Sequence, residues 1–213
     1  MRRCVPLLVL LLVAAGCGGG SASSTSSDAL LHPDQLTATA PAQFDAVFDT
    51  TKGDFTVRVN RAWAPRGADR FYELVRNGYY DRSKFFRVVR GFVVQFGLSA
   101  DPKVSLAWVD ATIPDDPVKK PNARGTVTFA SAGPNTRTTQ VFVNLADNSS
   151  LDSQGFAPFG EVVSGMRVVG SLYSGYGDMP SAHQGEIVNH GNAYLDQYFP
   201  QLDGIETATI AKN

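Results

Sequence analysis

The stretch that most constrains the fold covers residues 85–97 and reads FFRVVRGFVVQFG. Apart from glycine, its only residues that are not Phe or Val are Arg87, Arg90 and Gln95. This composition is typical of pleated, largely buried strands. Gly91 divides the run, and glycine adopts the backbone conformations that tight turns require. The stretch therefore predicts two strands that join at Gly91.

Arg87 is the residue in this stretch whose surroundings matter most. A cation beside aromatic surface is costly to bury without a partner, so its side chain either extends to water or binds something. The pattern alone favours the solvated arrangement, because single arginines on strand faces are usually exposed. From the pattern, both alternatives stay open.

Three segments of the chain resemble the signature of the cyclophilins, which are peptidyl-prolyl cis-trans isomerases. The first is the order Phe-x-Arg-Val-x-x-Gly-Phe-x-x-Gln-x-Gly in residues 85–97. The second is FASAGPNT at 129–136 followed by TQVFV at 139–143, and the third runs from 151 to 166. Three blocks in the family's order, spanning about residues 44–173, are more specific than one short motif. The resemblance implies a mainly β fold, a closed eight-stranded antiparallel barrel capped by two helices.

The activity that the resemblance implies is rotation about X-Pro bonds, which must cross a barrier of about 18 to 20 kcal/mol. A catalyst needs no cofactor or metal for this, because it has only to favour the twisted amide. The resemblance gives Arg87 the hydrogen bond to the amide nitrogen and adds Phe92 and Gln95 as catalytic residues. It implies peptide binding by Val93, Ala130, Ser131, Phe142, Leu151 and Phe156. For the apolar residues, ordinary barrel core is the alternative.

Several positions depart from the residues that are frequent in the family. Val93 stands where Met is frequent, and Ser150 stands where Trp is frequent. Phe156 and Phe86 both replace a common His, the second of them beside Arg87. The family uses that Trp to hold cyclosporin, and its loss removes an indole donor and a broad contact. We therefore expect weak cyclosporin binding.

Residues 1–16 resemble the signal peptide of a bacterial lipoprotein. Arg2 and Arg3 precede an apolar run at 5–13, and small residues then lead to Cys17, the residue that takes the lipid in such proteins. An ordinary cleaved secretory peptide and a short membrane anchor are the alternatives, although the apolar run is short for a bilayer. We expect an extracytoplasmic protein that is anchored to a bacterial membrane through lipidated Cys17.

The chain after the signal divides by composition into three parts. Residues 17–43 are expected to form a tether rich in Gly, Ser and Thr and an approach to the domain. The isomerase domain is expected over 44–190. A tail over 191–213 holds large apolar residues that should dock on the domain. Within the domain, four prolines in 98–124 argue against long regular elements there.

Periodicity predicts the elements around the central stretch. Residues alternate with period two from Phe44, and turn chemistry at 51–54 predicts a hairpin. Pro65 should start a helix that Gly78 ends, and residues 166–173 should form a second helix. Further strands are expected at 126–130, 140–143 and 159–163, with a short one at 187–188.

Composition and charge argue against several other functions. The chain has 19 Lys and Arg against 20 Asp and Glu, and no basic cluster follows the signal, so nucleic-acid binding is not expected. The sequence has no metal-ligand spacing of His or Cys and no Gly-x-Ser-x-Gly motif. The expected partners are Pro-containing polypeptides and, through Cys17, a membrane. The alternative function is a cyclophilin-like module that holds Pro-containing segments without turnover.

Overall fold

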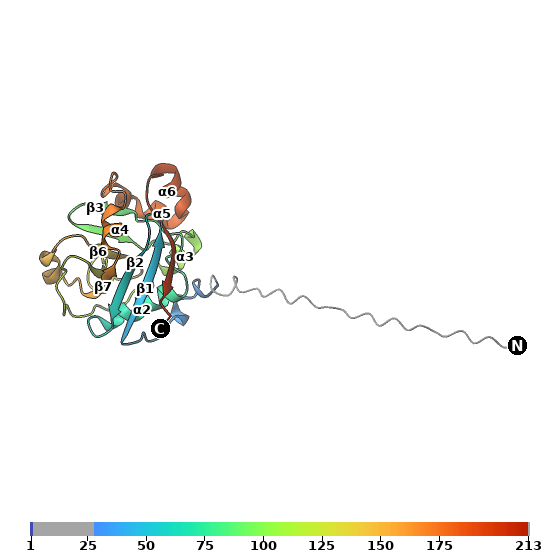
Figure 1. Cartoon of the computed structure of the whole chain (residues 1–213), viewed down its shortest axis with the longest axis horizontal. Coiled ribbons are helices and arrows are strands. Elements are labelled where there is room, and N and C mark those ends of the chain that lie inside the picture. The colour runs from blue at the N-terminus through green and yellow to red at the C-terminus, as the bar shows by residue number, and fades with distance from the viewer. Residues whose placement is uncertain (2–27, 213) are drawn as a thin grey trace.

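The structure is a computed structural model that describes Met1 and residues 28–212 (Figure 1). The predicted signal peptide and the lipidation of Cys17 lie outside the described residues. In the part of the chain that is described, helices are all too short or too polar to cross a bilayer.

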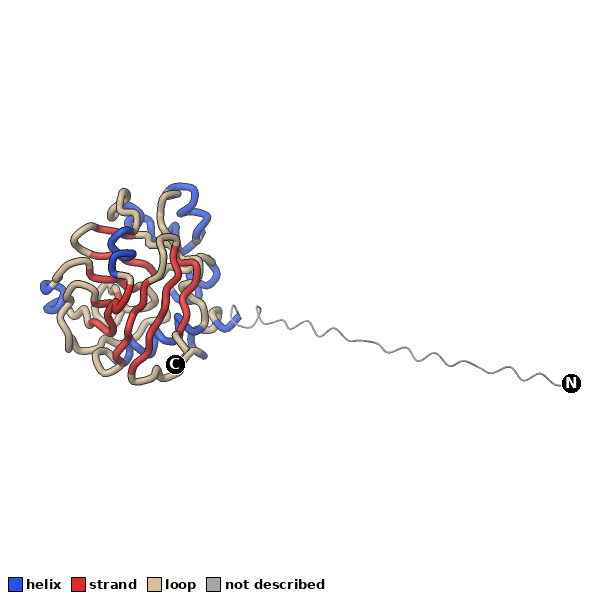
Figure 2. Tube along the Cα trace, in the orientation of Figure 1, coloured by secondary structure: helices blue, strands red, loops and turns tan. Residues whose placement is uncertain are grey.

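Eight antiparallel strands form one sheet, in the order β3-β4-β6-β5-β7-β2-β1-β8 (Figure 2). They are β1 (Gln43–Thr50), β2 (Phe55–Asn60), β3 (Arg87–Val89), β4 (Val93–Phe96), β5 (Thr126–Phe129), β6 (Val141–Asn144), β7 (Pro158–Ser164) and β8 (Ile205–Ile210). The expectation of a mainly β chain with eight antiparallel strands is confirmed.

The expected closure of the barrel is not present as a strand ladder, and the sheet is an open half-barrel over the described residues. Its edge strands β3 and β8 do not pair. The segment just before β3 reaches β8 instead, through an isolated bridge between Lys84 and Gly204 and a hydrogen bond from Ile205 N to Ser83 O at 2.8 Å. Strand β3 itself begins only at Arg87, beyond these contacts.

The predicted hairpin and the predicted connection of two strands at Gly91 are confirmed. Phe48 of β1 lies opposite Phe55 of β2, and their stacked ring centroids are 4.8 Å apart. Between β3 and β4, Gly91 has φ +70°, and Phe92 N donates to Val89 O at 3.0 Å. Aromatic side chains fill much of the core inside the sheet: Phe48, Phe55, Phe71, Tyr80, Phe85, Phe96 and Phe159.

More helices surround the sheet than the two that the sequence predicts. The α-helices are α2 (Pro65–Arg76), α3 (Pro102–Trp108), α4 (Met166–Ser171), α5 (Gln184–His190) and α6 (Asn192–Tyr198), and the 3-10 helices are η1 (Pro33–Gln35), η2 (Ser149–Gln154) and η3 (Met179–His183). The predicted helices correspond to α2 and α4. The others show no clear helical period in the sequence.

The Pro-rich segment 98–124 contains α3, which the sequence analysis did not predict. Pro102 occupies the first turn of this helix, and the side chain of Asp101 caps it by accepting a hydrogen bond from Lys103 N at 2.9 Å. Trp108 at its end is buried, and its Nε1 donates to Leu30 O at 2.8 Å. The approach segment before β1 therefore packs on the domain at this point.

The expected strand at 187–188 is wrong, because these residues lie in α5. Two adjacent apolar residues fit a strand or a buried helix turn equally well, so this pattern could not decide. Ile187 joins a second apolar cluster that holds α5 and α6 against the sheet, at the top of Figure 1. The buried members of this cluster are Phe86, Leu98, Ile187, Leu195, Phe199 and Leu202.

The C-terminal tail packs on the rest of the chain and also completes the sheet. After α6, β8 pairs with β1, where Ala208 lies opposite Phe48. Ala208 and Ile205 are buried by this pairing. The apolar residues of the tail are thus partly sheet core and partly the cover over Phe86.

Candidate functional site

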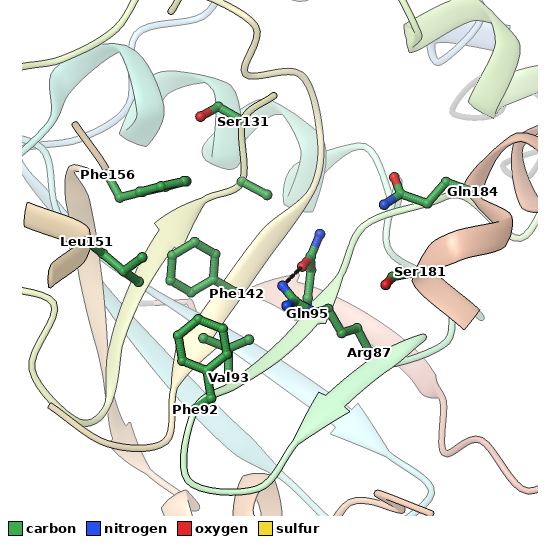
Figure 3. A pocket seen from close by; sticks show the side chains of 11 residues that line it. Arg87, Phe92, Val93, Gln95, Ser131, Phe142, Leu151, Phe156, Ser181 and Gln184 are labelled. Carbon is green, nitrogen blue, oxygen red and sulfur yellow. Dashed lines mark hydrogen bonds between the residues drawn. The ribbon is translucent and has the colours of Figure 1, made fainter. Parts of the chain in front are cut away.

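A pocket of about 250 Å³ opens beside strands β3, β4 and β6 (Figure 3). It is lined by Arg87, Phe92, Val93, Gln95, Ala130, Ser131, Phe142, Leu151, Phe156, Ser181 and Gln184. The first nine are the residues that the sequence analysis assigned to catalysis and peptide binding. The structure therefore brings all of them together, while their individual roles stay predictions.

Strand register explains why distant residues meet at this pocket. Arg87 of β3 lies opposite Gln95 of β4, and Gln95 lies opposite Phe142 of β6. Side chains that lie opposite one another on neighbouring strands project from the same face of a sheet. A cation, an amide and an aromatic ring thus form one row across three strands.

Arg87 has partners on two sides and is not merely solvated. Its Nη1 donates to Oε1 of Gln95 at 3.1 Å, and its Nε donates to Oδ1 of Asp178. The guanidinium carbon lies 5.5 Å from the ring centroid of Phe92, within cation–π range. The side chain is 27% exposed, so the group is held at the pocket and still open to a ligand.

Gln95 continues a line of side-chain amides away from Arg87. Its Nε2 donates to Oε1 of Gln140 at 2.9 Å, and Nε2 of Gln140 donates to Oε1 of Gln184 at 2.9 Å. Because each amide donates onward, the oxygen of Gln95 faces the guanidinium. Gln95 is only 6% exposed, so this orientation is fixed in a buried site.

Buried tyrosines hold the backbone that carries Gln140. The hydroxyl of Tyr80 donates to Thr139 O at 2.9 Å, and the hydroxyl of Tyr79 donates to Thr139 Oγ1 at 3.1 Å. Burial raises the pKa of Tyr79 to about 12 and raises that of Tyr80 as well, so both are neutral donors at ordinary pH. The backbone at Thr139 also approaches Gly97 so closely that a Cβ on residue 97 would lie 2.5 Å from Thr139 O.

The other side of the pocket is an apolar slot. Val93, Phe142 and Leu151 are buried, and Phe92, Ala130 and Phe156 pack on them while remaining partly open. The rings of Phe142 and Phe156 meet edge to face with centroids 5.8 Å apart. A slot of this kind suits a small apolar ring.

Buried Asn122 fixes the two segments that supply Leu151 and Phe156. Its Nδ2 donates to Asp152 Oδ1 and to Phe156 O, both at 2.8 Å. Its Oδ1 accepts from Thr128 Oγ1 of β5 at 2.9 Å. These bonds tie η2 and the following loop to the sheet, so the slot has a rigid far wall.

The sequence analysis missed the wall formed by η3 and α5. Figure 3 shows Ser181 and Gln184 on one side of the pocket and the apolar slot on the other, with Arg87 and Gln95 between them. The one available signal was Phe86, an apolar residue beside Arg87 in place of a common His. Phe86 is completely buried and anchors α5 and α6.

The other departures from the family pattern fall at different places. Val93 is buried in the slot, and Phe156 lies at its rim. Ser150 is exposed on η2 and does not line the pocket. In the described part of the chain, no three His, Cys, Asp or Glu side chains gather as a metal site would require.

Comparison with known proteins places this geometry in a family. A family model described as cyclophilin type peptidyl-prolyl cis-trans isomerase matches residues 46–191. The peptidyl-prolyl cis-trans isomerase CYP18-2 of Arabidopsis thaliana is 35% identical over 133 residues, which cover 61% of this chain and 80% of the relative. The peptidyl-prolyl cis-trans isomerase-like 1 of Aspergillus fumigatus is 36% identical over 131 residues, 59% of this chain and 79% of the relative.

Solved structures agree on the fold. A crystal structure of a cyclophilin type peptidyl-prolyl cis-trans isomerase of Cryptosporidium parvum has a TM-score of 0.61 at 20% identity, and the match covers 80% of this chain and 99% of that one. A second crystal structure of that protein, in the presence of the dipeptide Ala-Pro, has a TM-score of 0.60 at 20% identity, with 79% and 99% of the two chains covered.

Proposed function

The chain belongs to the cyclophilin-type peptidyl-prolyl cis-trans isomerase family and is an isomerase of that kind, and from this premise we propose that Arg87 carries the catalysis. We further propose that the substrates are X-Pro bonds of polypeptides outside the cytoplasm. The observation that carries the first proposal is a guanidinium fixed beside an apolar slot.

The proposed chemistry is stabilisation of the twisted amide. When the X-Pro bond rotates, the amide loses its resonance, and its nitrogen becomes pyramidal and able to accept a hydrogen bond. Arg87 uses one Nη1 hydrogen for Gln95 and its Nε hydrogen for Asp178. A guanidinium has five N–H groups, so three remain for the substrate. A bond that forms only to the twisted amide lowers the barrier without strengthening ground-state binding.

The apolar slot supplies the second half of the proposal. The proline ring would rest between Phe142, Leu151 and Phe156, with Val93 beneath it. With the ring held, the carbonyl on the other side of the bond can swing past Arg87 and Gln95. The backbone around Ala130 and Ser131 lies at the same rim and would hold the peptide, although Ala130 N itself donates to Gln140 O at 2.9 Å.

A refolding assay limited by proline isomerisation tests the role of Arg87. Arg87→Ala should lower kcat/KM about a hundredfold, the effect of losing one charged transition-state hydrogen bond worth roughly 2 to 4 kcal/mol. Arg58→Ala is the matched control, because Arg58 is also an ion-paired arginine on a strand, with Asp45 as its partner. Equal activity of wild type and Arg87→Ala would reject the mechanism.

The proposal of an extracytoplasmic, membrane-anchored enzyme rests on the N-terminal sequence. Arg2 and Arg3, the apolar run and Cys17 support it. Labelling of growing cells with a fatty acid should mark the wild-type chain and leave Cys17→Ser unlabelled. If Cys17→Ser is labelled equally, or the wild type is never labelled, the anchor is rejected while the isomerase activity is unaffected.

A further inference from the structure

Asp178 places a carboxylate directly on the guanidinium of the pocket. It precedes η3, and its Oδ1 accepts a hydrogen bond from Nε of Arg87. The side chain of Asp178 is 61% exposed, and it contacts Arg87, which lines the pocket, so a polypeptide bound there would pass close to it. Nothing in the sequence pattern around 85–97 indicates this contact, because the partners are 91 positions apart.

The segment that carries Asp178 is held in place on both sides. Before it, Nε of Arg90 donates to Ser174 Oγ at 2.6 Å, and the ring of Tyr176 meets that of Phe199 with centroids 5.2 Å apart. After it, Pro180 is buried. Asp178 O itself accepts from Ser181 N at 3.0 Å and from Ser181 Oγ at 2.6 Å. The carboxylate thus sits on an anchored turn next to Arg87.

Other arginines of this protein show what Asp178 prevents. Arg58 binds the carboxylate of Asp45 in a bidentate way, through Nε and Nη2, both at 2.9 Å. Arg61 binds Asp69 in the same bidentate way, at 2.7 and 2.8 Å. This fork is the strong mode of carboxylate binding. In Arg87 the single Nε hydrogen is already donated to Asp178, so an incoming carboxylate cannot use the Nε–Nη2 fork that Arg58 and Arg61 use.

We propose that Asp178 is a specificity-determining residue. It keeps acidic side chains of the polypeptide from binding Arg87, and it favours a basic residue immediately before the proline. The carboxylate blocks the capture of substrate Asp or Glu by Arg87, and it repels such residues through its own charge. A Lys or Arg beside the proline meets an attractive charge at the same place. This inference rests on the proposed role of Arg87 and adds a charge preference to it.

The test is the steady-state isomerisation of three matched peptides with Lys, Ala or Glu before the proline, using the full chain. Wild type should prefer Lys over Glu by about tenfold in kcat/KM, from attraction and repulsion at an exposed site. The ratio should approach one in Asp178→Asn. It should also shrink in wild type at about 1 M salt, where the Debye length is about 3 Å.

Asp196→Asn is the matched control for this experiment. Asp196 is also 61% exposed and pairs with a cation, Lys84, at 3.1 Å, but Lys84 does not line the pocket as Arg87 does. Its loss changes the net charge by the same amount and should leave the Lys-to-Glu ratio unchanged. Asp178→Lys should invert the preference. Urea midpoints near that of wild type would show that the variants fold, because an exposed ion pair contributes little to stability.

Two results would overturn the inference. One is a Lys-to-Glu ratio that is the same in wild type and Asp178→Asn, and the other is an equal shift in Asp196→Asn. Failure of the Arg87 mechanism looks different, because Arg87→Ala would then keep its rate on the neutral Ala peptide. The neutral peptide therefore reports on Arg87, and the charged pair reports on Asp178.

Discussion

Arg87 and Gln95 lie opposite each other on β3 and β4, and Nη1 of the arginine donates to Oε1 of the glutamine at 3.1 Å. Because Arg87 and Gln95 lie opposite each other on paired strands, strand register and this hydrogen bond fix the position of the guanidinium. Gln95 in turn is oriented by Gln140. A catalytic group that must act from one fixed position requires neighbours that are themselves held in place in this way.

Gln95→Leu should lower kcat/KM about tenfold, because it removes the acceptor that aims Arg87 and leaves the cation in place. Gln95→Glu keeps an acceptor for Arg87 but cannot donate to Gln140, so its loss should be smaller. Peptide isomerisation kinetics on both variants check this. Equal activity of Gln95→Leu and wild type would mean that Arg87 does not need this support.

Phe142→Leu should raise KM for Pro-containing peptides several-fold, because Phe142 shapes the slot together with Phe156. Phe129→Leu is the control, since Phe129 is equally buried on the other side of the sheet, in the main core. Each substitution should cost about 1 kcal/mol of stability. Identical KM changes in the two variants would show that the effect is general loosening and not loss of the slot.

Tyr79→Phe should destabilise the protein by about 1 kcal/mol near neutral pH, because the hydrogen bond to Thr139 is lost. The folded pKa of Tyr79 is about 12, above the value of 10.0 for a free tyrosine. The unfolded chain therefore loses the hydroxyl proton of Tyr79 at a lower pH than the folded chain does. The contribution of Tyr79 to the free energy of unfolding falls as the pH rises from about 10 toward 12. The difference in urea midpoint between wild type and variant should be smaller at about pH 11 than at about pH 7. A difference independent of pH would contradict this.

Cyclosporin should inhibit the wild-type isomerase weakly, because Ser150 supplies neither the indole donor nor the surface of a Trp. Ser150 is exposed on η2, so Ser150→Trp is sterically possible and should tighten inhibition. Ser153→Trp, at another exposed position of the same helix, should have no such effect. Nanomolar inhibition of the wild type would show that the expectation is wrong.

Local periodicity and the three motif blocks were enough to predict seven of the eight strands and the lining of the pocket other than Ser181 and Gln184. Alternation around Phe44, the glycine at position 91 and the spacing from Arg87 to Gln95 are local features, and the structure confirms the elements that they predict. The motif order also assigned Phe142 and Leu151 to the same site, and both residues line the pocket. Phe142 lies on a predicted strand, whereas Leu151 lies on η2, which the sequence analysis did not predict.

The missed parts depend on contacts between distant segments. Helices α5 and α6 have seven residues each and owe their place to docking on Phe86. Helical propensity alone does not stabilise helices of this length, so their sequence gives a weak signal. For the same reason the pairing of Asp178 with Arg87 could not be predicted, and neither could the interruption of the barrel between Phe85 and Arg87.

The rate of cis-trans exchange of a proline peptide bound to the enzyme, measured by NMR exchange spectroscopy together with its affinity, tests the central claim most directly. In Arg87→Lys, which keeps the charge but lacks the planar fork, affinity should stay within a few-fold while bound-state exchange slows at least tenfold. Unchanged exchange, or an affinity that falls by the same factor as the rate, would contradict transition-state stabilisation by Arg87.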